Sequence, residues 1–341
     1  MGQAISVKDE ATTLGFTALK GVKIAVVIPC YNEELTIAGV ISEFHEQLPD
    51  ADIYVFDNNS TDRTAEKARN AGARVLYEKR QGKGYVVQSM FRCVDADVYL
   101  MVDGDGTYPA DDVHKLIQPI LWDEADMVVG SRLHADSESA FKSLNRLGNR
   151  IFLSLLHATF KVAITDMLSG YRAFGRRFVK SMPLFGGGFE TETELTIKAL
   201  ERGCRILEIP VNLTERPEGS FSKIRIARDG MRILNTILAL VRDYKPLTFF
   251  GTLGSLSMIL GFIPGFVVVV EFIRTGLVTR IPSAVFAVGM VLSGMLSFTV
   301  GLVLHTIARR SQEFDFQLRS LFDELNHQTQ RTNADRGRWS S

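Results

Sequence analysis

Two aspartates one residue apart, Asp103 and Asp105, directly follow the apolar residues 98–102, which predict a buried strand. The intervening Gly104 permits tight backbone geometry, so both carboxylates can turn toward one divalent cation. A hard cation held by one or two carboxylates completes its shell with water and substrate phosphates. The pattern therefore predicts a metal site for a phosphorylated donor. The alternative is an Asp-Gly turn between two elements that binds nothing.

Apolar segments alternate with helical patterns on both sides of this pair. Strands are expected over residues 22–29, 53–57, 73–77, 98–102, 126–129 and 205–211. Helices are expected up to residue 48, after the polar cluster 58–62, from 84 to about 94, and over 146–161 and 189–202. This alternation is typical of an α/β domain whose mostly parallel sheet is covered on both faces. Ligands of such sheets bind at the carboxyl ends of the strands, where the polar clusters fall.

Three glutamates, Glu190, Glu192 and Glu194, occupy the first turns of the helix expected over 189–202. Carboxylates are favourable at the positive end of a helix dipole, and we assign the three glutamates to that role.

The composition excludes several classes of protein. The 341 residues include 39 Lys and Arg and 39 Asp and Glu, so the formal net charge is zero and no nucleic-acid partner is expected. The cysteines at 30, 93 and 204 are scattered, which predicts neither a disulfide framework nor a zinc site and suits a reducing compartment. A dinucleotide-binding domain is not expected, since no GxGxxG motif follows the first strand. Residues 1–21 are expected to be a flexible N-terminus without the apolar core of a signal peptide.

Two long apolar segments occupy the second half of the chain. Residues 247–270 and 281–304 carry no charged side chain, and each exceeds the ~20 residues that a helix needs to cross ~30 Å of hydrocarbon. We expect two transmembrane helices, at about 247–273 and 281–307, within residues 246–308. Gly261 and Gly265 would let the first helix pack closely against the second. The alternative is a pair of buried helices in a soluble core.

Residues 223–245 combine basic and apolar side chains at helical spacing directly before the first span. They predict an amphipathic helix that lies at the membrane interface. The alternative is an ordinary surface helix of the soluble domain. Residues beyond 326 are polar and are expected to be disordered.

Basic residues predict the orientation in the membrane. The connector between the spans holds only Arg274 and Arg280, whereas more basic residues flank the other ends of the spans: Lys223, Arg225, Arg228, Arg232, Arg242, Lys245, Arg309 and Arg310. The positive-inside bias therefore places a catalytic domain over 22–222, the tail 309–341 and both termini in the cytoplasm. We expect an integral membrane protein of a bacterial-type inner or plasma membrane.

Further motifs occur in a fixed order along the chain. Residues 27–34 read Val-Ile-Pro-Cys-Tyr-Asn-Glu-Glu, Asp57 ends the second expected strand, and Lys83 lies between two glycines. Later motifs are Gly-Ser-Arg at 130–132, Asn-Arg-Leu-Gly-Asn at 145–149, Asp-Met-Leu-Ser-Gly-Tyr-Arg at 166–172 and Arg-Pro-Glu-Gly-Ser-Phe-Ser-Lys at 216–223. From about residue 24 to the end of the second span, the chain resembles glycosyltransferase family 2, with its GT-A fold. The likeness extends to the membrane-bound polyisoprenyl-phosphate glycosyltransferases, such as dolichol-phosphate mannose synthases and bacterial enzymes that glucosylate undecaprenyl phosphate.

The resemblance implies a nucleotide site and a metal site at the first of these motifs. The implied nucleotide-binding residues are Pro29, Tyr31, Glu33, Asp57, Lys83 and Asp103, with Lys83 directed at a diphosphate oxygen. Asp103 and Asp105 match the family's metal motif, so Mg²⁺ or Mn²⁺ is the implied cofactor. Residues 107–109 replace the Gln or His that mannosyl-lipid members often carry there, which leaves the third metal ligand open. Without the resemblance, Lys83 would be a solvated turn residue.

The resemblance assigns the later motifs to a lipid phosphate. The implied lipid-phosphate residues are Arg132, Arg146, Arg172, Arg216, Ser220 and Lys223, and the implied catalytic residues are Asp103, Asp105, Arg132 and Asp166. The planar fork of arginine suits a phosphate better than the point charge of lysine. Taken singly, the arginines would form surface ion pairs, and the loop 216–223 could instead meet anionic lipid headgroups.

The implied activity is inverting transfer of one hexose from a nucleotide diphosphate sugar to polyprenyl phosphate on the cytoplasmic leaflet. UDP-glucose is the first choice of donor and GDP-mannose the second, and a homo-oligomer stays open. Because a phosphate monoester has its second pKa at about 6, the attacking oxygen needs no general base. One alternative is a processive polysaccharide synthase, whose QxxRW motif is matched only in spacing by Gln118 and Trp122, with Leu121 at the arginine position. The other is a non-catalytic membrane scaffold.

Overall fold

The computed structural model describes residues 21–132, 164–185, 188, 191–214 and 226–338. The chain divides into two compact units, residues 1–237 and 238–341.

The first unit is built on one sheet of seven strands in the order β3-β2-β1-β4-β6-β5-β7. Their bounds are β1 Ile24–Cys30, β2 Asp52–Asp57, β3 Arg74–Tyr77, β4 Val98–Met101, β5 Met127–Ser131, β6 Arg172–Gly175 and β7 Ile206–Pro210. All neighbours pair in parallel except β6, which is antiparallel to both β4 and β5. The six expected strands are present, whereas β6 was not predicted from the sequence.

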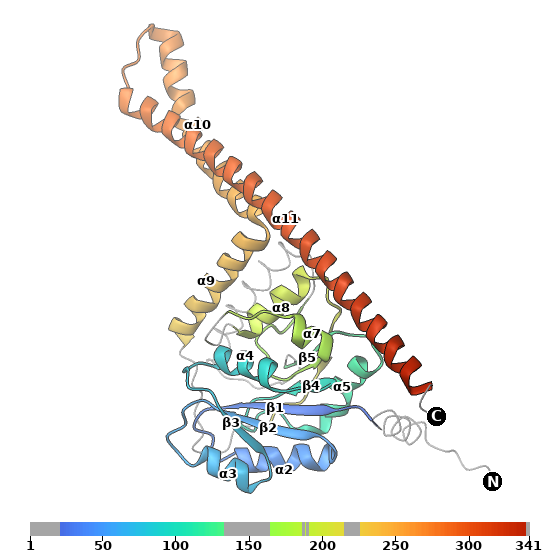
Figure 1. Ribbon diagram of the computed structural model, residues 1–341. Helices are drawn as coiled ribbons and strands as arrows, with labels where there is room; N and C mark the ends of the chain where they lie inside the picture. Colours follow the sequence, from blue (N-terminus) through green and yellow to red (C-terminus); the bar gives the residue numbers. More distant parts are fainter. Residues whose placement is uncertain (1–20, 133–163, 186–187, 189–190, 215–225, 339–341) are drawn as a thin grey trace, which may run out of the picture. The chain divides into compact units, whose positions relative to one another are not determined.

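Helices cover both faces of the sheet (Figure 1). Their bounds are α2 Ile37–Gln47, α3 Thr64–Asn70, α4 Lys83–Cys93, η1 Ala110–Asp112, α5 Val113–Leu121, α7 Arg176–Ser181 and α8 Thr191–Glu201. Alternate residues of β1 serve the two layers: Val26 and Ile28 pack with α2, α3 and α5, while Ala25 and Val27 pack with α4, α7 and α8. The expected mostly parallel α/β fold is therefore confirmed.

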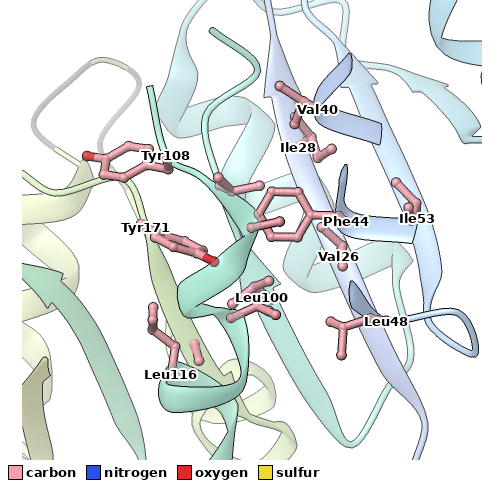
Figure 2. Close-up of a cluster of buried hydrophobic side chains, with 14 of the residues drawn as sticks. Val26, Ile28, Val40, Phe44, Leu48, Ile53, Leu100, Tyr108, Leu116 and Tyr171 are labelled. Carbon is pink, nitrogen blue, oxygen red and sulfur yellow. The ribbon is translucent and has the colours of Figure 1, made fainter. Parts of the chain in front are cut away.

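Two tyrosines anchor loops of the carboxyl edge to this core (Figure 2). The Tyr108 and Tyr171 rings have centroids 5.3 Å apart, and Tyr171 meets Phe44 of α2 edge-on at 6.0 Å. Tyr108 lies at the end of the segment that contains the two aspartates, and Tyr171 lies at the end of the 166–171 segment. Burial of these rings therefore holds the two segments together at one place.

The second unit contains the end of α9 (Ile226–Tyr244) and the long helices α10 (Pro246–Thr275) and α11 (Ile281–Arg338). Segments Pro246–Thr275 and 281–311 are long and apolar enough to cross a membrane, and only 6% and 17% of their most apolar windows are buried. So little burial does not fit core helices of a soluble protein. The interfacial placement of residues 223–245 stays a prediction.

The end of the chain differs from expectation. Residues beyond 326 were expected to be disordered, but α11 continues as a helix to Arg338. The physical reason is that extending an existing helix avoids the cost of nucleating a new one.

Small residues let α10 and α11 pack along each other. A Cβ on Gly261 would lie 2.9 Å from the Ala287 carbonyl oxygen, which confirms the expected close packing at this glycine. The Ser257 hydroxyl donates to the carbonyl of Met290 on the facing helix at 2.8 Å. Close backbone approach and such hydrogen bonds stabilise helix pairs in lipid.

Gly294→Ala is expected to destabilise this helix pair by about 1–3 kcal/mol, because overpacking a tight interface costs that much. A Cβ on Gly294 would lie 2.7 Å from the backbone oxygen of Gly254, which cannot move away as a side chain can. Thermal unfolding of the full chain in detergent measures the effect. Gly289→Ala on the same helix is the matched control, since its Cβ meets nothing within 4 Å. Equal melting temperatures for the two variants would contradict the prediction.

Candidate active site

The carboxyl ends of four strands bring the described site residues to one edge of the sheet. β1 runs parallel to β2 and to β4. β5 points the same way as β4, because β6 lies antiparallel between them. The polar segments after these strands therefore meet at the edge where α/β sheets bind their ligands.

The two aspartates that follow β4 have different surroundings. Asp105 is buried, and its Oδ1 accepts hydrogen bonds from the Thr107 N–H at 3.1 Å and hydroxyl at 2.6 Å. The Asp103 side chain is 27% exposed. The φ of Gly104 lies outside the left-handed region, so its backbone conformation does not require glycine. Glycine is needed for space, because a Cβ there would lie 2.6 Å from Cys30 Sγ. This corrects the expected reason for Gly104, which was backbone freedom.

Lys83 is the first residue of α4 and lies between two carboxylates. Its Nζ is 2.5 Å from Asp103 Oδ1 and 2.6 Å from Glu192 Oε1. Burial by itself would lower the pKa of Lys83, but the two carboxylates outweigh it and raise this pKa above its ordinary value. Lys83 is therefore a permanent cation at neutral pH. Its contact with a nucleotide diphosphate stays a prediction.

Glu192 is a site residue that the sequence analysis did not identify. Its residue is 3% exposed, and α8 is buried along almost its whole length. A carboxylate in such a helix requires a cationic partner, so interaction with the helix dipole alone does not explain it. The available signal was the spacing, because glutamates at every second position cannot share one helix face.

Arg132 follows β5 and forms a two-bond ion pair with Asp166. Arg132 Nε and Nη2 each lie 2.7 Å from an Asp166 carboxylate oxygen. Burial tends to raise the pKa of Asp166, but the hydrogen bonds and charge of Arg132 outweigh it and lower this pKa. Both groups are therefore charged, and the guanidinium plane is fixed. Two of its five N–H groups serve Asp166, which leaves others suited to an anion.

A second unpredicted carboxylate fixes the backbone around Asp166. Glu208 on β7 accepts hydrogen bonds from the N–H groups of Asp166 and Thr165, both at 2.9 Å. The ion pair of Arg132 is therefore braced from two strands. Nothing in the sequence around Glu208 indicated this role, since the contact joins residues 42 positions apart.

The structure contradicts the predicted contact of Arg172 with a lipid phosphate. Arg172 is fully buried in β6 and donates to the carbonyls of Ser169 at 2.8 Å and Met167 at 2.6 Å. It also donates to the Thr196 hydroxyl of α8 at 2.8 Å. Its guanidinium thus holds the 167–169 segment against α8. The prediction was wrong because an arginine in such a motif can bind an anion or donate to buried backbone carbonyls, and the sequence does not distinguish the two.

The implied nucleotide residues lie side by side. The register of β1 and β2 pairs Pro29 with Phe56 and Cys30 with Asp57, and beyond the strand the Glu33 N–H donates to the Thr64 hydroxyl at 2.8 Å. Asp57 is 3% exposed, and its Oδ1 has no hydrogen-bond partner within the described part of the chain. A buried acceptor without a partner is uncommon and requires a donor that the described residues do not supply.

Asn58 connects this nucleotide side to Lys83. Its side-chain amide donates to the carbonyls of Glu78 at 2.9 Å and Arg80 at 2.7 Å, and its Oδ1 accepts from the Gly82 N–H at 2.7 Å. Gly82 has φ 139°, which favours glycine. The approach to α4 is therefore fixed, and with it the backbone of Lys83.

Four predicted site residues, Arg146, Arg216, Ser220 and Lys223, lie outside the described residues. Their assignment to the lipid phosphate stays a prediction. The described range 191–214 ends at Thr214, whose N–H donates to the Thr107 carbonyl at 3.0 Å. The Thr107 hydroxyl donates to Asp105, so Thr214 lies close to the aspartate pair.

The donor set fits one divalent cation. Asp103, Asp105, Asp166 and Glu192 carry four negative charges, and Lys83 and Arg132 carry two positive charges, which leaves −2. Within the described ranges, no group of three or more His, Cys, Asp or Glu residues is arranged around a metal position. Two carboxylates completed by water and phosphate oxygens are typical of Mg²⁺. The identity of the metal stays a prediction.

Gly170→Ala is expected to lower activity about a hundredfold, since displacement of a catalytic group by about 1 Å has that effect. A Cβ on Gly170 would lie 2.7 Å from Asp103 Cγ, so the added methyl group must move the carboxylate or the 166–171 segment. Initial rates with saturating substrates measure the loss. Gly175→Ala is the control, because its Cβ makes an ordinary 3.5 Å contact with Ile120. Full activity of Gly170→Ala would show that the packed carboxylate is not needed.

Comparisons with known proteins extend over most of the chain. The profile described as Glycosyl transferase family 2 matches residues 25–182. Glycosyltransferase AglJ of Haloferax volcanii is 34% identical over 289 residues, which cover 83% of this chain and 94% of that protein. A dolichyl-phosphate hexose transferase of the same organism is 32% identical over 193 residues, covering 57% of this chain and 83% of that one.

A solved structure has a similar fold. Glucosyl-3-phosphoglycerate synthase from Mycobacterium tuberculosis, in complex with Mn²⁺ and UDP-glucose, matches with a TM-score of 0.57 at 22% identity. The match covers 70% of this chain and 84% of that one. At this identity the likeness concerns the fold alone.

Proposed function

Because the chain belongs to glycosyltransferase family 2, we propose that it transfers one hexose from a nucleotide diphosphate sugar to a polyprenyl phosphate. UDP-glucose is the favoured donor and GDP-mannose the alternative. The predicted GT-A fold and enzyme class are confirmed, and the non-catalytic scaffold is set aside with them. The name of one relative, a dolichyl-phosphate hexose transferase, supports a lipid-phosphate acceptor.

The packing of Gly170 against Asp103 is the observation that carries the proposal. It places the aspartate pair directly beside the segment that bears Asp166, which in turn holds Arg132. The aspartate pair, proposed to hold the metal, and Arg132, proposed to bind the acceptor phosphate, therefore lie at one edge of the sheet. A reaction between two phosphorylated substrates needs such an arrangement, because their repulsion must be offset at reacting distance.

The proposed reaction is a single displacement. An oxygen of the acceptor phosphate attacks the anomeric carbon, the new C–O bond forms, and the bond to the nucleoside diphosphate breaks with inversion. The acceptor is already a dianion at neutral pH, since its second pKa is about 6, so no residue has to remove a proton. The described residues orient the substrates and neutralise their charge.

Five of the described side chains have a proposed part in this reaction. Asp57 accepts from the base, and Arg132, held flat by Asp166, binds the acceptor phosphate. Asp105, with Asp103 assisting, would hold Mg²⁺ or Mn²⁺, which offsets charge on a leaving diphosphate.

The enzyme is proposed to act at the membrane. A polyprenyl chain stays in lipid, and α10 and α11 are long and apolar enough to anchor the enzyme there. The basic residues before α10 and after 308 support a cytoplasmic catalytic domain and cytoplasmic termini.

Mass spectrometry of lipid products tests the proposal. The full chain in detergent is incubated with Mg²⁺ or Mn²⁺, with UDP-glucose, UDP-N-acetylglucosamine or GDP-mannose, and with dolichyl or undecaprenyl phosphate. A lipid carrying a single sugar phosphodiester is expected, most abundant with UDP-glucose. A product only with GDP-mannose would select the alternative donor. Long glycan chains would indicate a processive synthase, and no lipid product with any pair would overturn the proposal.

A further inference from the structure

Lys83 neutralises one of the two aspartates that are proposed to bind metal. Its Nζ lies 2.5 Å from Asp103 Oδ1 and 2.6 Å from Glu192 Oε1. The three residues come from the start of α4, the segment after β4 and α8, so only the tertiary structure brings them together. A lysine ammonium group therefore lies on a carboxylate that a divalent cation would need.

The two carboxylates differ in access. The Glu192 side chain is 4% exposed and the Asp103 side chain is 27% exposed, with Lys83 at 13% between them. A ligand from solvent can compete with Lys83 for Asp103, whereas Glu192 is shielded from solvent by the surrounding protein. Breaking the contact with Glu192 would leave a buried charge unpaired, which is costly. The contact with Asp103 is therefore the one that can be exchanged.

The backbone of Lys83 stays fixed during such an exchange. Gly82 is held by the side chain of Asn58 at 2.7 Å, and α4 begins directly after it. Only the four-carbon side chain has to move, and lysine is flexible enough for a short swing. Its Nζ can leave Asp103 while it keeps its partner on α8.

We propose that Lys83 is a built-in substitute for the divalent cation at Asp103, and that Glu192 retains Lys83 when the donor arrives. In the donor-free enzyme Lys83 occupies Asp103 and weakens metal binding. An incoming diphosphate takes Lys83 as its partner, and Asp103 is released to the metal. Metal and nucleotide then bind cooperatively, because each displaces the same contact. This inference rests on the proposed function.

Lys83→Gln tests the competition, because the amide keeps hydrogen-bond donors and removes the charge. Mn²⁺ affinity without nucleotide is measured on the full chain in detergent from the electron paramagnetic resonance signal of free Mn²⁺. UDP affinity is measured by calorimetry at saturating Mn²⁺. We expect Lys83→Gln to bind Mn²⁺ at least about tenfold tighter and UDP at least about tenfold weaker. Opposite signs exclude a merely structural role, since a damaged site would bind both ligands less well.

Lys79→Gln is the matched control for the loss of one positive charge. Lys79 is exposed and lies four positions earlier. Its variant is expected to stay within threefold of the wild type for both ligands. Equal tightening of Mn²⁺ binding by both variants, or none by Lys83→Gln, would overturn the inference.

Glu192→Gln tests whether Glu192 acts through Lys83. Alone, it should weaken Mn²⁺ binding, because Lys83 then stays on Asp103. Combined with Lys83→Gln, it should change Mn²⁺ affinity less than threefold, since no lysine is left to retain. An effect of the same size in both backgrounds would remove Glu192 from the inference. If the wild type binds Mn²⁺ but no UDP or GDP, the proposed function fails instead.

Discussion

Asp105→Ala is expected to reduce glycosyl transfer about 10²–10³-fold, with folding and membrane insertion retained. The proposed cation offsets charge on the leaving diphosphate, and removing one such stabilising group costs about 10²–10³ in rate. Asp105 is the more buried of the two aspartates, so solvent cannot take its place. Rates of lipid-linked sugar formation at saturating substrates measure the loss.

Asp105→Asn separates the charge from the turn that Asp105 supports. Its side-chain oxygen can still accept from the N–H and hydroxyl of Thr107, which Asp105 Oδ1 accepts at 3.1 and 2.6 Å. We expect nearly the same loss as in the alanine variant, and a melting temperature closer to the wild type. Asp111→Asn, on the exposed side of η1, is the control for the amide substitution. Normal turnover in both Asp105 variants would end the metal hypothesis.

Arg132→Ala is expected to lower kcat/KM for the lipid phosphate about 10²–10³-fold and to leave UDP affinity within threefold. Truncation removes the charge-assisted hydrogen bonds of Arg132 to the acceptor phosphate, each worth about 1.5–3 kcal/mol. It also leaves the Asp166 carboxylate, at 3% exposure, without its cation. Steady-state rates at varied lipid concentration and UDP calorimetry separate the two substrates. A variant that loses only nucleotide affinity would show that Arg132 serves the donor.

Two further variants sharpen this test. Asp166→Asn keeps the shape of the ion pair but loosens the guanidinium, so it should reproduce part of the Arg132 defect, and the double variant should be non-additive. Arg205→Ala is the matched control. Arg205 forms a similar pair with Asp126 at 3.1 Å, but at the start of β5 and β7 rather than at their carboxyl ends. It should leave lipid use unchanged.

Local patterns predicted the parts of the site that lie directly after strands. An apolar run followed by polar residues marks the end of a parallel strand, and such ends meet at one edge. Asp57, Asp103, Asp105 and Arg132 could be placed there for that reason. Among the described strands, the antiparallel β6 was missed because its four residues, Arg-Ala-Phe-Gly, lack a clear period.

Contacts between distant segments could not be predicted in the same way. Glu192 looked like a helix-end carboxylate, and Arg172 looked like an anion-binding arginine. Their burial explains their actual roles. Glu192 pairs with Lys83 of another helix, and Arg172 donates to backbone carbonyls in the core. Gly104 was expected for its backbone freedom, but the nearby Cys30 side chain shows that space is the reason.

The amino-acid sequence by itself determined six of the seven described strands, the two apolar spans and the acidic pair, because each depends on neighbours within a few positions. Only the tertiary structure decided which charges meet. Lys83 shares its charge between Asp103 and Glu192, and Glu208 braces the Asp166 that fixes Arg132. Such pairings depend on burial and on strand order, and a one-dimensional pattern contains neither.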